Sequence, residues 1–483
     1  MMKAVRSEKN ISPHGGAVPI LKKIKEFGIP QVIRACLGKR VAQSNFGYED
    51  ILIAWVLTSL CGGTRLDHIT KMKKKLSIIP GLKLPSHDTL GRGMKKLATE
   101  TLTARNISHH KDAKIIYTDY NDNIQMNRML VKSTKRAGAL KEGQSYTLDV
   151  DATFIATECR GANRTITDGG KIDYNKIGFN PMVCLIQNLP VFVSMRNGSA
   201  GARFQLKECL ENCLNLLSES KIKVGRIISD AAGYSKEAFE MIDSKGIKFN
   251  VRFPYTVKME TFKGELKKCS GWRKTEIETA NFFWNCEIAD IPYKMFDKPY
   301  EKHISKTWRV VAIRIPNDET LKLIDKDEFE RKMMTKEKLN SLSAKSVLKP
   351  SGKTYNDLNW KEIDGYSYKF FITNDFERTS EEIVLEYNKR GNAERKFSFM
   401  KNDFGWNLPP FMNMNENAVF MIAAALANNV FRAMVMTFKK EIPELRLNAR
   451  LPEFQFIFID VACEYINNTF IFYNTDMPYE KIM

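Results

Sequence analysis

An α/β fold is predicted for this chain by three observations. The first 145 residues are read as helices separated by Gly and Pro. From residue 146, short apolar segments with strand periodicity alternate with helical segments. After residue 254 the pattern turns rich in strands and aromatic residues, and the earlier pattern resumes near residue 367. The predicted parts are a helical N-terminal region (1–145), a core in two pieces (146–254 and 367–440), a β-rich insertion (255–366) and a helical tail (441–483).

The composition points to a large basic globular protein. With 483 residues, 43% of them hydrophobic, the chain can bury a large core. Lys and Arg number 75 against 56 Asp and Glu, which gives a formal charge of +19, and the pI is near 9.3. Such charge can serve solubility alone, but the clusters "KMKKK" and "KSTKR" favour a nucleic acid as the partner.

The cysteine and histidine content argues against a disulfide framework and against a His-based zinc site. Nine cysteines without a C-x-x-C pair indicate reduced thiols in the cytoplasm, and six histidines give little support to a His-based zinc site. The N-terminal segment lacks the apolar core of a signal peptide. The apolar run 418–436 is interrupted by Asn428, Asn429 and Arg432, so a buried helix is expected there rather than a membrane span.

The N-terminal region contains one segment of special interest, "LPSHDTLGRGMKKL". It predicts a short basic helix that begins after Ser86 or Asp88 as N-cap. Such a helix suits a helix-turn-helix element. A plain structural helix is at least as well supported, because two glycines weaken it.

The segment "YTLDVDATFIA" alternates strictly between apolar and polar residues. This periodicity predicts a strand with one buried face and with Asp149 and Asp151 together on the other. Strands "PMVCLIQ" and "PVFVSMR" follow, then a helix, a strand ending at Asp230, a helix and a further strand. This is the element order of a ribonuclease H-like core, whose acidic residues lie on the first strand, after the fourth strand and on a late helix.

The late helix is expected over about 380–400, with Thr379 or Ser380 as N-cap. At about 100° per residue its polar side chains fall within roughly 60° of one another on one stripe beside apolar residues. The stripe consists of Tyr387, Arg390, Glu394 and Lys401. Spacing alone also fits an ordinary salt-bridged helix face.

Three acidic residues on separate elements suit hard, oxygen-seeking metals such as Mg²⁺. Asp151, Asp230 and Glu394 are the candidates. A single Asp at a strand end is most often a turn or cap residue. Three acidic residues in the order expected of one fold favour a metal site, where two ions about 3.5 to 4 Å apart can promote phosphodiester displacement.

The four polar residues of the stripe form the pattern Y-x2-R-x3-E-x6-K. This pattern resembles the signature of the DDE transposase superfamily of bacterial insertion sequences (transposase DDE group 1). The segments "DVDAT" and "DAAGY" resemble its first two acidic motifs, and "SNFGYEDILIAWVLTSLCGGTRLDHI" and "LPSHDTLGR" resemble its helical N-terminal region. The likeness covers most of the chain.

The resemblance implies a role for each candidate. Asp151, Asp230 and Glu394 would be the catalytic metal-binding triad for two Mg²⁺, with Mn²⁺ able to substitute. The other three residues of the stripe, Tyr387, Arg390 and Lys401, would bind DNA phosphates. The family pattern Asp-x-Thr is satisfied by Asp151 and Thr153, and Asp149 would then be structural or support the site.

The implied function is a transposase that cuts the ends of an insertion sequence and joins them to target DNA. Its partner would be double-stranded DNA, with the helical N-terminal region (1–145) as the DNA-binding region. Its active complex would be a homodimer and its location the bacterial cytoplasm near the nucleoid, with no membrane and no small-molecule substrate. A structure-specific metal-dependent nuclease of the same fold and a domesticated DNA-binding descendant are the alternatives. Trp284 or Trp308 in the insertion would stack on a flipped base, unless they belong to the core.

Overall fold

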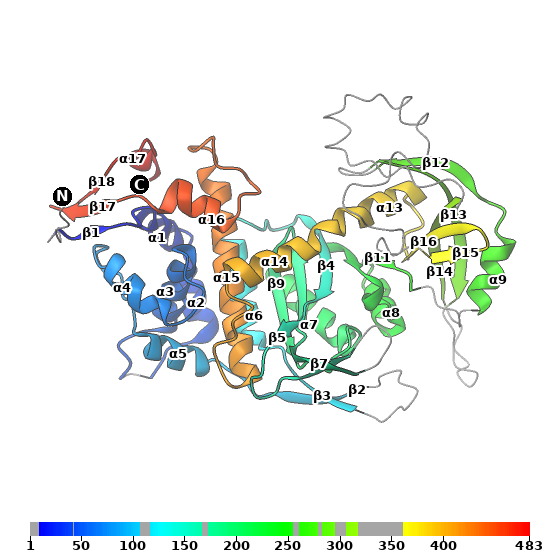
Figure 1. The fold of residues 1–483 in the computed structure, drawn as a ribbon, viewed down its shortest axis with the longest axis horizontal. Coiled ribbons are helices and arrows are strands. Elements are labelled where there is room, and N and C mark those ends of the chain that lie inside the picture. The colour runs from blue at the N-terminus through cyan, green and yellow to red at the C-terminus, as the bar shows by residue number, and fades with distance from the viewer. Residues whose placement is uncertain are drawn as a thin grey trace, which may run out of the picture. The chain divides into compact units, whose positions relative to one another are not determined.

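The structure is a computed structural model. It describes residues 9–41, 43–106, 116–166, 172–254, 260–278, 283–294, 306–316 and 361–483. The chain forms two compact units (Figure 1). Unit 1 comprises residues 1–146, 152–223 and 394–483, and unit 2 comprises residues 147–151 and 224–393. Both mix helices and strands, so the α/β class is confirmed at this level.

Unit 1 is built around one long buried helix, α15 (Met414–Phe438), against which helices and a sheet strand pack. The sequence prediction of a buried helix here is confirmed. α15 is long and apolar enough to span a membrane, but 89% of its most apolar window is buried inside the protein. The N-terminal helices of this unit are α1 (Ala17–Glu26), α2 (Ile29–Leu37), α3 (Tyr48–Leu60), α4 (His68–Lys75), α5 (His87–Lys95) and α6 (Ile124–Arg136).

Helix α5 is the short basic helix that the sequence predicts. Ser86 is its N-cap, and the Ser86 hydroxyl accepts a hydrogen bond from the Thr89 N–H at 3.3 Å. Gly93 is required by packing, because a Cβ at this position would lie 2.9 Å from the Ile51 side chain of α3. Residues 76–86 join α4 to α5, a connection longer than the turn of a compact helix-turn-helix.

The strands of unit 1 form one antiparallel arrangement in the order β8-β9-β3-β2 and two small sheets. The four strands are β2 (Leu102–Asn106), β3 (Ile116–Asn121), β8 (Met182–Ile186) and β9 (Leu189–Arg196). One small sheet contains β5 (Ile155–Ala156), β6 (Asn163–Ile166) and β7 (Ile172–Phe179). The other contains β1 (Ile11–Ser12), β17 (Cys463–Ile466) and β18 (Thr469–Phe472). Helix α7 (Leu206–Glu219) packs on β8 and β9, and α16 (Leu451–Phe454), a π-helical turn (Gln455–Ile459) and α17 (Tyr479–Ile482) complete the unit.

The strands of unit 2 follow the order β12-β13-β14-β16-β11-β10-β4, with β15 also paired to β16. They are β4 (Ser145–Ala152), β10 (Lys223–Ser229), β11 (Lys248–Arg252), β12 (Arg273–Glu278), β13 (Phe283–Lys294), β14 (Thr307–Pro316), β15 (Lys361–Ile363) and β16 (Tyr366–Thr373). β10 and β11 are parallel, whereas the pairings from β11 through β16 to β12 are antiparallel. Helices α8 (Lys236–Ser244), α9 (Glu260–Lys268) and α13 (Ser380–Asn388) accompany this sheet.

The predicted insertion is described only in part. β12, β13 and β14 extend the same sheet as β16 and β11. Residues 317–360 of the predicted insertion lie outside the described residues. The boundaries of the insertion therefore stay a prediction.

The single late helix predicted from the sequence is wrong. α13 ends at Asn388, a 3₁₀ turn covers Lys389–Asn392, and α14 covers Ala393–Asp403. Gly391 lies in this turn, where its low helix propensity weakens a regular α-helix and favours the tighter winding. Because the winding changes here, the stripe calculated at 100° per residue is not continuous. The predicted N-cap is confirmed, since Thr379 and Glu382 form a reciprocal capping box.

Candidate active site

Two strands of unit 2 bring the first two predicted acidic residues to neighbouring positions. In β4, Leu148 and Val150 are buried, as the alternation predicts, and Asp151 is half-buried. The Ser229 hydroxyl of β10 donates a hydrogen bond to the Val150 carbonyl at 3.0 Å. Asp151 and Asp230 are the next residues on these two segments. Asp230 caps the 3₁₀ turn Ala231–Gly233 by accepting the Ala232 N–H at 2.9 Å.

Arg390 lies between the two carboxylates of β4. Its Nε donates to Asp149 Oδ1 at 3.0 Å, and its Nη2 lies 2.7 Å from Asp151 Oδ2. All three side chains are largely buried, with exposed fractions of 11% for Arg390, 7% for Asp149 and 16% for Asp151. Burial alone would lower the pKa of Arg390, but Asp151, Asp149 and, further out, Asp230 raise it above its ordinary value. The guanidinium is therefore a fixed positive charge.

Tyr387 lies at the edge of the apolar core, as predicted. Its ring packs against Phe371 of β16 at a centroid distance of 4.9 Å, beside the buried Ile383 and Val384. Burial raises the pKa of the phenol to about 12, although Arg390 and Arg252 oppose this shift. The hydroxyl group is therefore neutral at ordinary pH and can donate a hydrogen bond.

Two cationic residues near this site were missed by the sequence analysis. Ser229 pairs with Val251 in the parallel β10–β11 register, so Arg252, the last residue of β11, lies beside Asp230. Burial lowers the pKa of Arg252, while Tyr387 and Asp230 oppose that shift. On β16, burial lowers the pKa of Lys369 to about 7, with Arg252 adding to the effect. Arg252 could have been identified from the sequence, because it is a basic residue at the end of the strand that follows the second acidic motif.

The other two residues of the stripe belong to unit 1. Glu394 begins that unit's last segment, and its side chain lies outside the described residues. Lys401 donates from Nζ to the Phe154 carbonyl at 2.8 Å, and burial lowers its pKa. Among the side chains that the structure describes, no three His, Cys, Asp or Glu residues are arranged for a metal ion.

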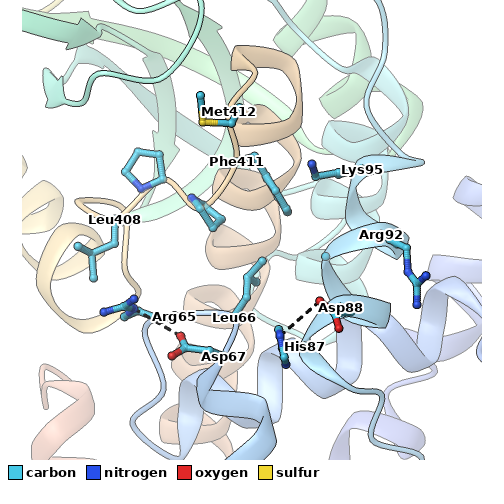
Figure 2. A pocket seen from close by; sticks show the side chains of 13 residues that line it. Arg65, Leu66, Asp67, His87, Asp88, Arg92, Lys95, Leu408, Phe411 and Met412 are labelled. Atoms are coloured by element: carbon cyan, nitrogen blue, oxygen red, sulfur yellow. Dashed lines mark ion pairs between the residues drawn. The ribbon is translucent and has the colours of Figure 1, made fainter.

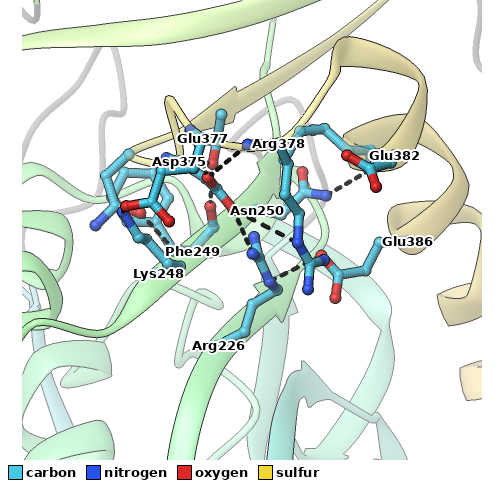
Figure 3. Close-up of polar contacts among 12 residues, drawn as sticks. Arg226, Lys248, Phe249, Asn250, Asp375, Glu377, Arg378, Glu382 and Glu386 are labelled. Atoms are coloured by element: carbon cyan, nitrogen blue, oxygen red, sulfur yellow. Dashed lines mark hydrogen bonds and ion pairs between the residues drawn. The ribbon is translucent and has the colours of Figure 1, made fainter.

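A second buried arginine holds the helix that carries Tyr387 (Figure 3). Arg226 of β10 forms an ion pair with Asp375, and its Nε lies 2.8 Å from Glu386 Oε2 on α13. Arg378 Nη1 lies 2.9 Å from the same oxygen of Glu386. Asp375 Oδ1 also accepts the backbone N–H groups of Glu377 and Arg378. These contacts fasten α13 to the sheet.

The structure does not support Trp308 as a residue that stacks on a flipped base. This side chain is 2% exposed and packs against Phe249 and Phe239 at centroid distances of 5.3 and 6.3 Å. Trp308 is therefore a core residue, because its side chain is buried against other aromatic rings. The side chain of Trp284 lies outside the described residues.

The charges of this site suit a hard cation and an anionic substrate. Asp149 and Asp151 contact Arg390, and Asp230 is a further acidic neighbour that interacts electrostatically with both Arg390 and Arg252. Carboxylate oxygens are the ligands that Mg²⁺ prefers, and a divalent cation would offset the excess of negative charge. The donor chemistry of Asp151 and Asp230 therefore fits the expected metal.

Comparison with known proteins places the chain in a family. A model of the transposase DDE domain matches residues 142–430, which is more than half of the chain. A similar solved structure is the cryo-EM structure of the piggyBac transposase synaptic complex with hairpin DNA; it shares 10% sequence identity, covers 90% of this chain and 78% of that chain, and gives a TM-score of 0.39. No curated protein matches the chain. The expected family is confirmed: the chain belongs to the DDE-domain transposases.

Proposed function

We propose that this DNA transposase cuts the ends of a mobile element and joins them to target DNA at a site formed by Asp151, Asp230 and Glu394. The proposal includes a ribonuclease H-like core, in keeping with the order β4, β8, β9, α7, β10, α8, β11. It also includes double-stranded DNA as the partner, and a homodimer as the active assembly.

The observation that carries this assignment is the surplus of carboxylates around Arg390. Asp149 and Asp151 both contact the Arg390 guanidinium, and Asp230 adds a third carboxylate, so three carboxylates face the two guanidinium groups of Arg390 and Arg252. A structural ion pair does not need this excess, because uncompensated buried charge is costly. A site that binds divalent cations during catalysis does need an excess of negative charge.

Each residue then has a distinct task. Asp151, Asp230 and Glu394 would hold two Mg²⁺, which when bound activate the attacking oxygen and stabilise the leaving oxygen. Arg390 and Tyr387 would donate hydrogen bonds to phosphate oxygens, and Lys401 would add a positive charge. In this assignment the guanidinium of Arg390 exchanges a carboxylate partner for a phosphate.

Burial favours Asp151 over Asp149 as the first metal ligand. Asp149 is the less exposed of the two and accepts a hydrogen bond from Arg390 Nε. Asp151 is more accessible at the end of β4. In this assignment Asp149 anchors Arg390, and Asp151 would present its oxygens to a bound metal ion.

A cleavage and strand-transfer assay on linear DNA carrying the element ends tests the proposal. Asp230→Ala and Asp151→Asn should abolish cutting in Mg²⁺ or Mn²⁺ and leave DNA affinity largely intact, because the carboxylates bind metal rather than DNA. Glu377→Gln is the matched control, since Glu377 is exposed and outside the site. Full cutting by Asp230→Ala would refute the proposal.

The same assay separates the alternatives. A structure-specific nuclease would cut without joining, and a domesticated binding protein would bind without cutting. Metal binding has its own readout, because a ligand that binds only the folded state raises the melting temperature. The wild-type protein should melt at a higher temperature in Mg²⁺, and Asp151→Asn should show a smaller rise.

A further inference from the structure

A row of charged side chains crosses the edge of the unit 2 sheet at which β4, β10 and β11 end. It extends over four neighbouring strands in the order β4, β10, β11 and β16. The first two members are acidic and the last two are basic: Asp151, Asp230, Arg252 and Lys369. All four positions are half-buried. The row is therefore acidic at the candidate metal site and basic on the next two strands.

The pairing of β11 with β16 fixes the position of Lys369. Arg252 pairs with Phe371 in the antiparallel register, and the next residue, Phe253, donates its N–H to the Phe370 carbonyl at 2.9 Å. Lys369 therefore lies just beyond the end of β11. Because side chains alternate along a strand, Lys369 is on the same face of the sheet as Phe371 and Arg252.

This face of the sheet is the one that α13 covers. The Phe371 ring packs against Tyr387 of α13. Ile313, which pairs with Lys369 from β14, belongs to the same buried cluster as Phe371. Lys369 thus shares a face with Tyr387, although it lies outside the Y-x2-R-x3-E-x6-K pattern.

The surroundings of Lys369 disfavour its positive charge. Burial lowers the pKa of Lys369 to about 7, and Arg252 adds to this shift because like charges repel. Burial also lowers the pKa of Arg252, while Tyr387 and Asp230 oppose that shift. An anion bound beside both side chains would relieve the repulsion. The basic end of the row is therefore suited to an anionic ligand.

A groove of about 970 Å³ in unit 1 shows the contrasting case (Figure 2). Three basic side chains that line it contact acidic ones: Arg65 with Asp67, His87 with Asp88, and Lys95 with Glu416. This local pairing offsets positive charge within the groove. At the basic end of the row in unit 2, two cations lie next to each other instead.

The length of the row suits a strand of DNA better than a single phosphate. Neighbouring strands of a sheet lie about 4.8 Å apart, so β16 lies about 10 Å from β10, the strand that precedes Asp230. A phosphate bound at the carboxylates would occupy one end of the row. A polyanion that continues along the row would bring a neighbouring phosphate to Lys369.

We propose that Lys369 is a further DNA-binding residue of the carboxylate site, whose ammonium group contacts a backbone phosphate next to the one that is cut and so positions the strand over Asp151 and Asp230. The inference rests on the proposed function, which supplies DNA as the ligand and the carboxylates as the place of cutting. Lys369 forms no covalent bond in this role. It offers a point charge with three hydrogen-bond donors.

Single-turnover cleavage of linear DNA carrying the element ends, by the full-length protein in Mg²⁺, tests the inference. Lys369→Met should slow cleavage about tenfold, in line with the loss of a hydrogen bond between charged groups. Lys369→Arg should retain most of the rate, because it keeps the positive charge. Lys361→Met is the matched control and should cut at the wild-type rate. Lys361 is exposed, and its pairing with Tyr368 places it on the opposite face of the same sheet.

The melting temperature separates this role from a structural one. Lys369→Met should melt at the wild-type temperature or above it, because burial disfavours the charge that methionine removes. A lower melting temperature together with slower cleavage would show that Lys369 supports the fold, and it would overturn the inference.

DNA in which single phosphates next to the cut are replaced by uncharged methylphosphonates identifies the contact. At one position the replacement should slow the wild-type protein about tenfold but Lys369→Met by less than about twofold, because the variant has already lost this contact. Equal slowing of the two proteins at every position would contradict the inference, as would cleavage by Lys369→Met at the wild-type rate.

The outcomes for Lys369 and for the proposed function can be distinguished. If the wild-type protein cuts and Asp230→Ala does not, while Lys369→Met cuts as fast as the wild-type protein, only the inference about Lys369 fails. If the wild-type protein does not cut the DNA ends, the proposed function fails with it.

Discussion

Two buried arginines of unit 2, Arg226 and Arg390, each bridge two carboxylates but differ in their balance of charge. Arg226 bridges Asp375 and Glu386, and a second arginine, Arg378, pairs with the same two acids. Arg390 bridges Asp149 and Asp151, with Asp230 as a further acidic neighbour. The first cluster therefore has two cations for two anions, and the second, in which Arg252 lies beside Asp230, has two cations for three anions.

This difference teaches how a structural cluster can be distinguished from a candidate catalytic one. In the Arg226 cluster, Asp375 also accepts two backbone N–H groups, so its charge is satisfied within the protein. The Arg390 cluster carries an excess of negative charge that an incoming cation can neutralise. Burial is similar in both clusters, so the balance of charge is the informative quantity.

The largest expected effect is the loss of stability on breaking the balanced cluster. Arg226→Met should lower the free energy of unfolding by about 3–5 kcal/mol, because it leaves buried carboxylates without their partner. Denaturant unfolding measures this change, and Mg²⁺ should not reverse it. Arg378→Met is the control with a smaller loss, since Arg378 is 44% exposed. Equal losses in the two variants would contradict the distinction.

A loss of similar size, but dependent on metal, is expected at the other arginine. Arg390→Met should destabilise the metal-free protein by about 3–5 kcal/mol, because it too leaves buried carboxylates without their partner. Added Mg²⁺ should then raise the melting temperature of Arg390→Met more than that of the wild-type protein, since a cation replaces the guanidinium. Thermal unfolding with Mg²⁺ and with EDTA decides this. If Mg²⁺ raised the melting temperature of Arg226→Met equally, the two clusters would not differ in their response to metal, and the distinction would be wrong.

Cleavage rates allow Arg390 to be compared with Lys401, the other basic residue of the Y-x2-R-x3-E-x6-K pattern. Arg390→Ala should slow single-turnover cleavage roughly 10- to 100-fold, in line with the loss of charged hydrogen bonds worth about 1.5–3 kcal/mol. Lys401→Ala should slow it less, because Lys401 offers a point charge and already donates to the Phe154 carbonyl. Unchanged cleavage rates in both variants would indicate that the four signature residues form an ordinary salt-bridged helix face.

The smallest expected effect is a dependence of stability on pH in the balanced cluster. Burial alone would raise the pKa of Asp375, but Arg226 and the N–H groups of Arg378 and Glu377 lower it below its ordinary value. The stability from this group is therefore present above about pH 4 and is lost as pH falls through the lowered pKa. Melting temperatures between about pH 5 and pH 3 should fall less steeply for Asp375→Asn than for the wild-type protein.

Local features of the fold could be predicted from the sequence. The alternation around Asp149 and Asp151 gave the buried and polar faces of β4, and the capping residues Ser86 and Thr379 marked two helix starts correctly. These features depend on neighbours within a few residues. The break at Gly391 was missed, because one glycine is compatible with both a continuous helix and a 3₁₀ turn.

The partners of the two arginines could not be predicted in the same way. Arg226 and Asp375 are 149 residues apart in the sequence, and Arg390 and Asp149 are 241 apart. Helical periodicity correctly placed Tyr387 at the edge of a core, but it holds no information on which strand end faces Arg390. The family signature named Arg390 as a DNA ligand, whereas the carboxylate contacts emerge only from the fold.

The pairing of β1 with β17 bears on which segments could be exchanged between related chains. Ile11 pairs with Glu464 and Ser12 with Cys463, while α3 and α5 pack against α15 near the other end of the sequence. The N-terminal helices thus share a core with the C-terminal part of the chain. An exchange of residues 1–145 between relatives would cut through this core, so a chimera that keeps the core intact would have to carry the C-terminal segment as well.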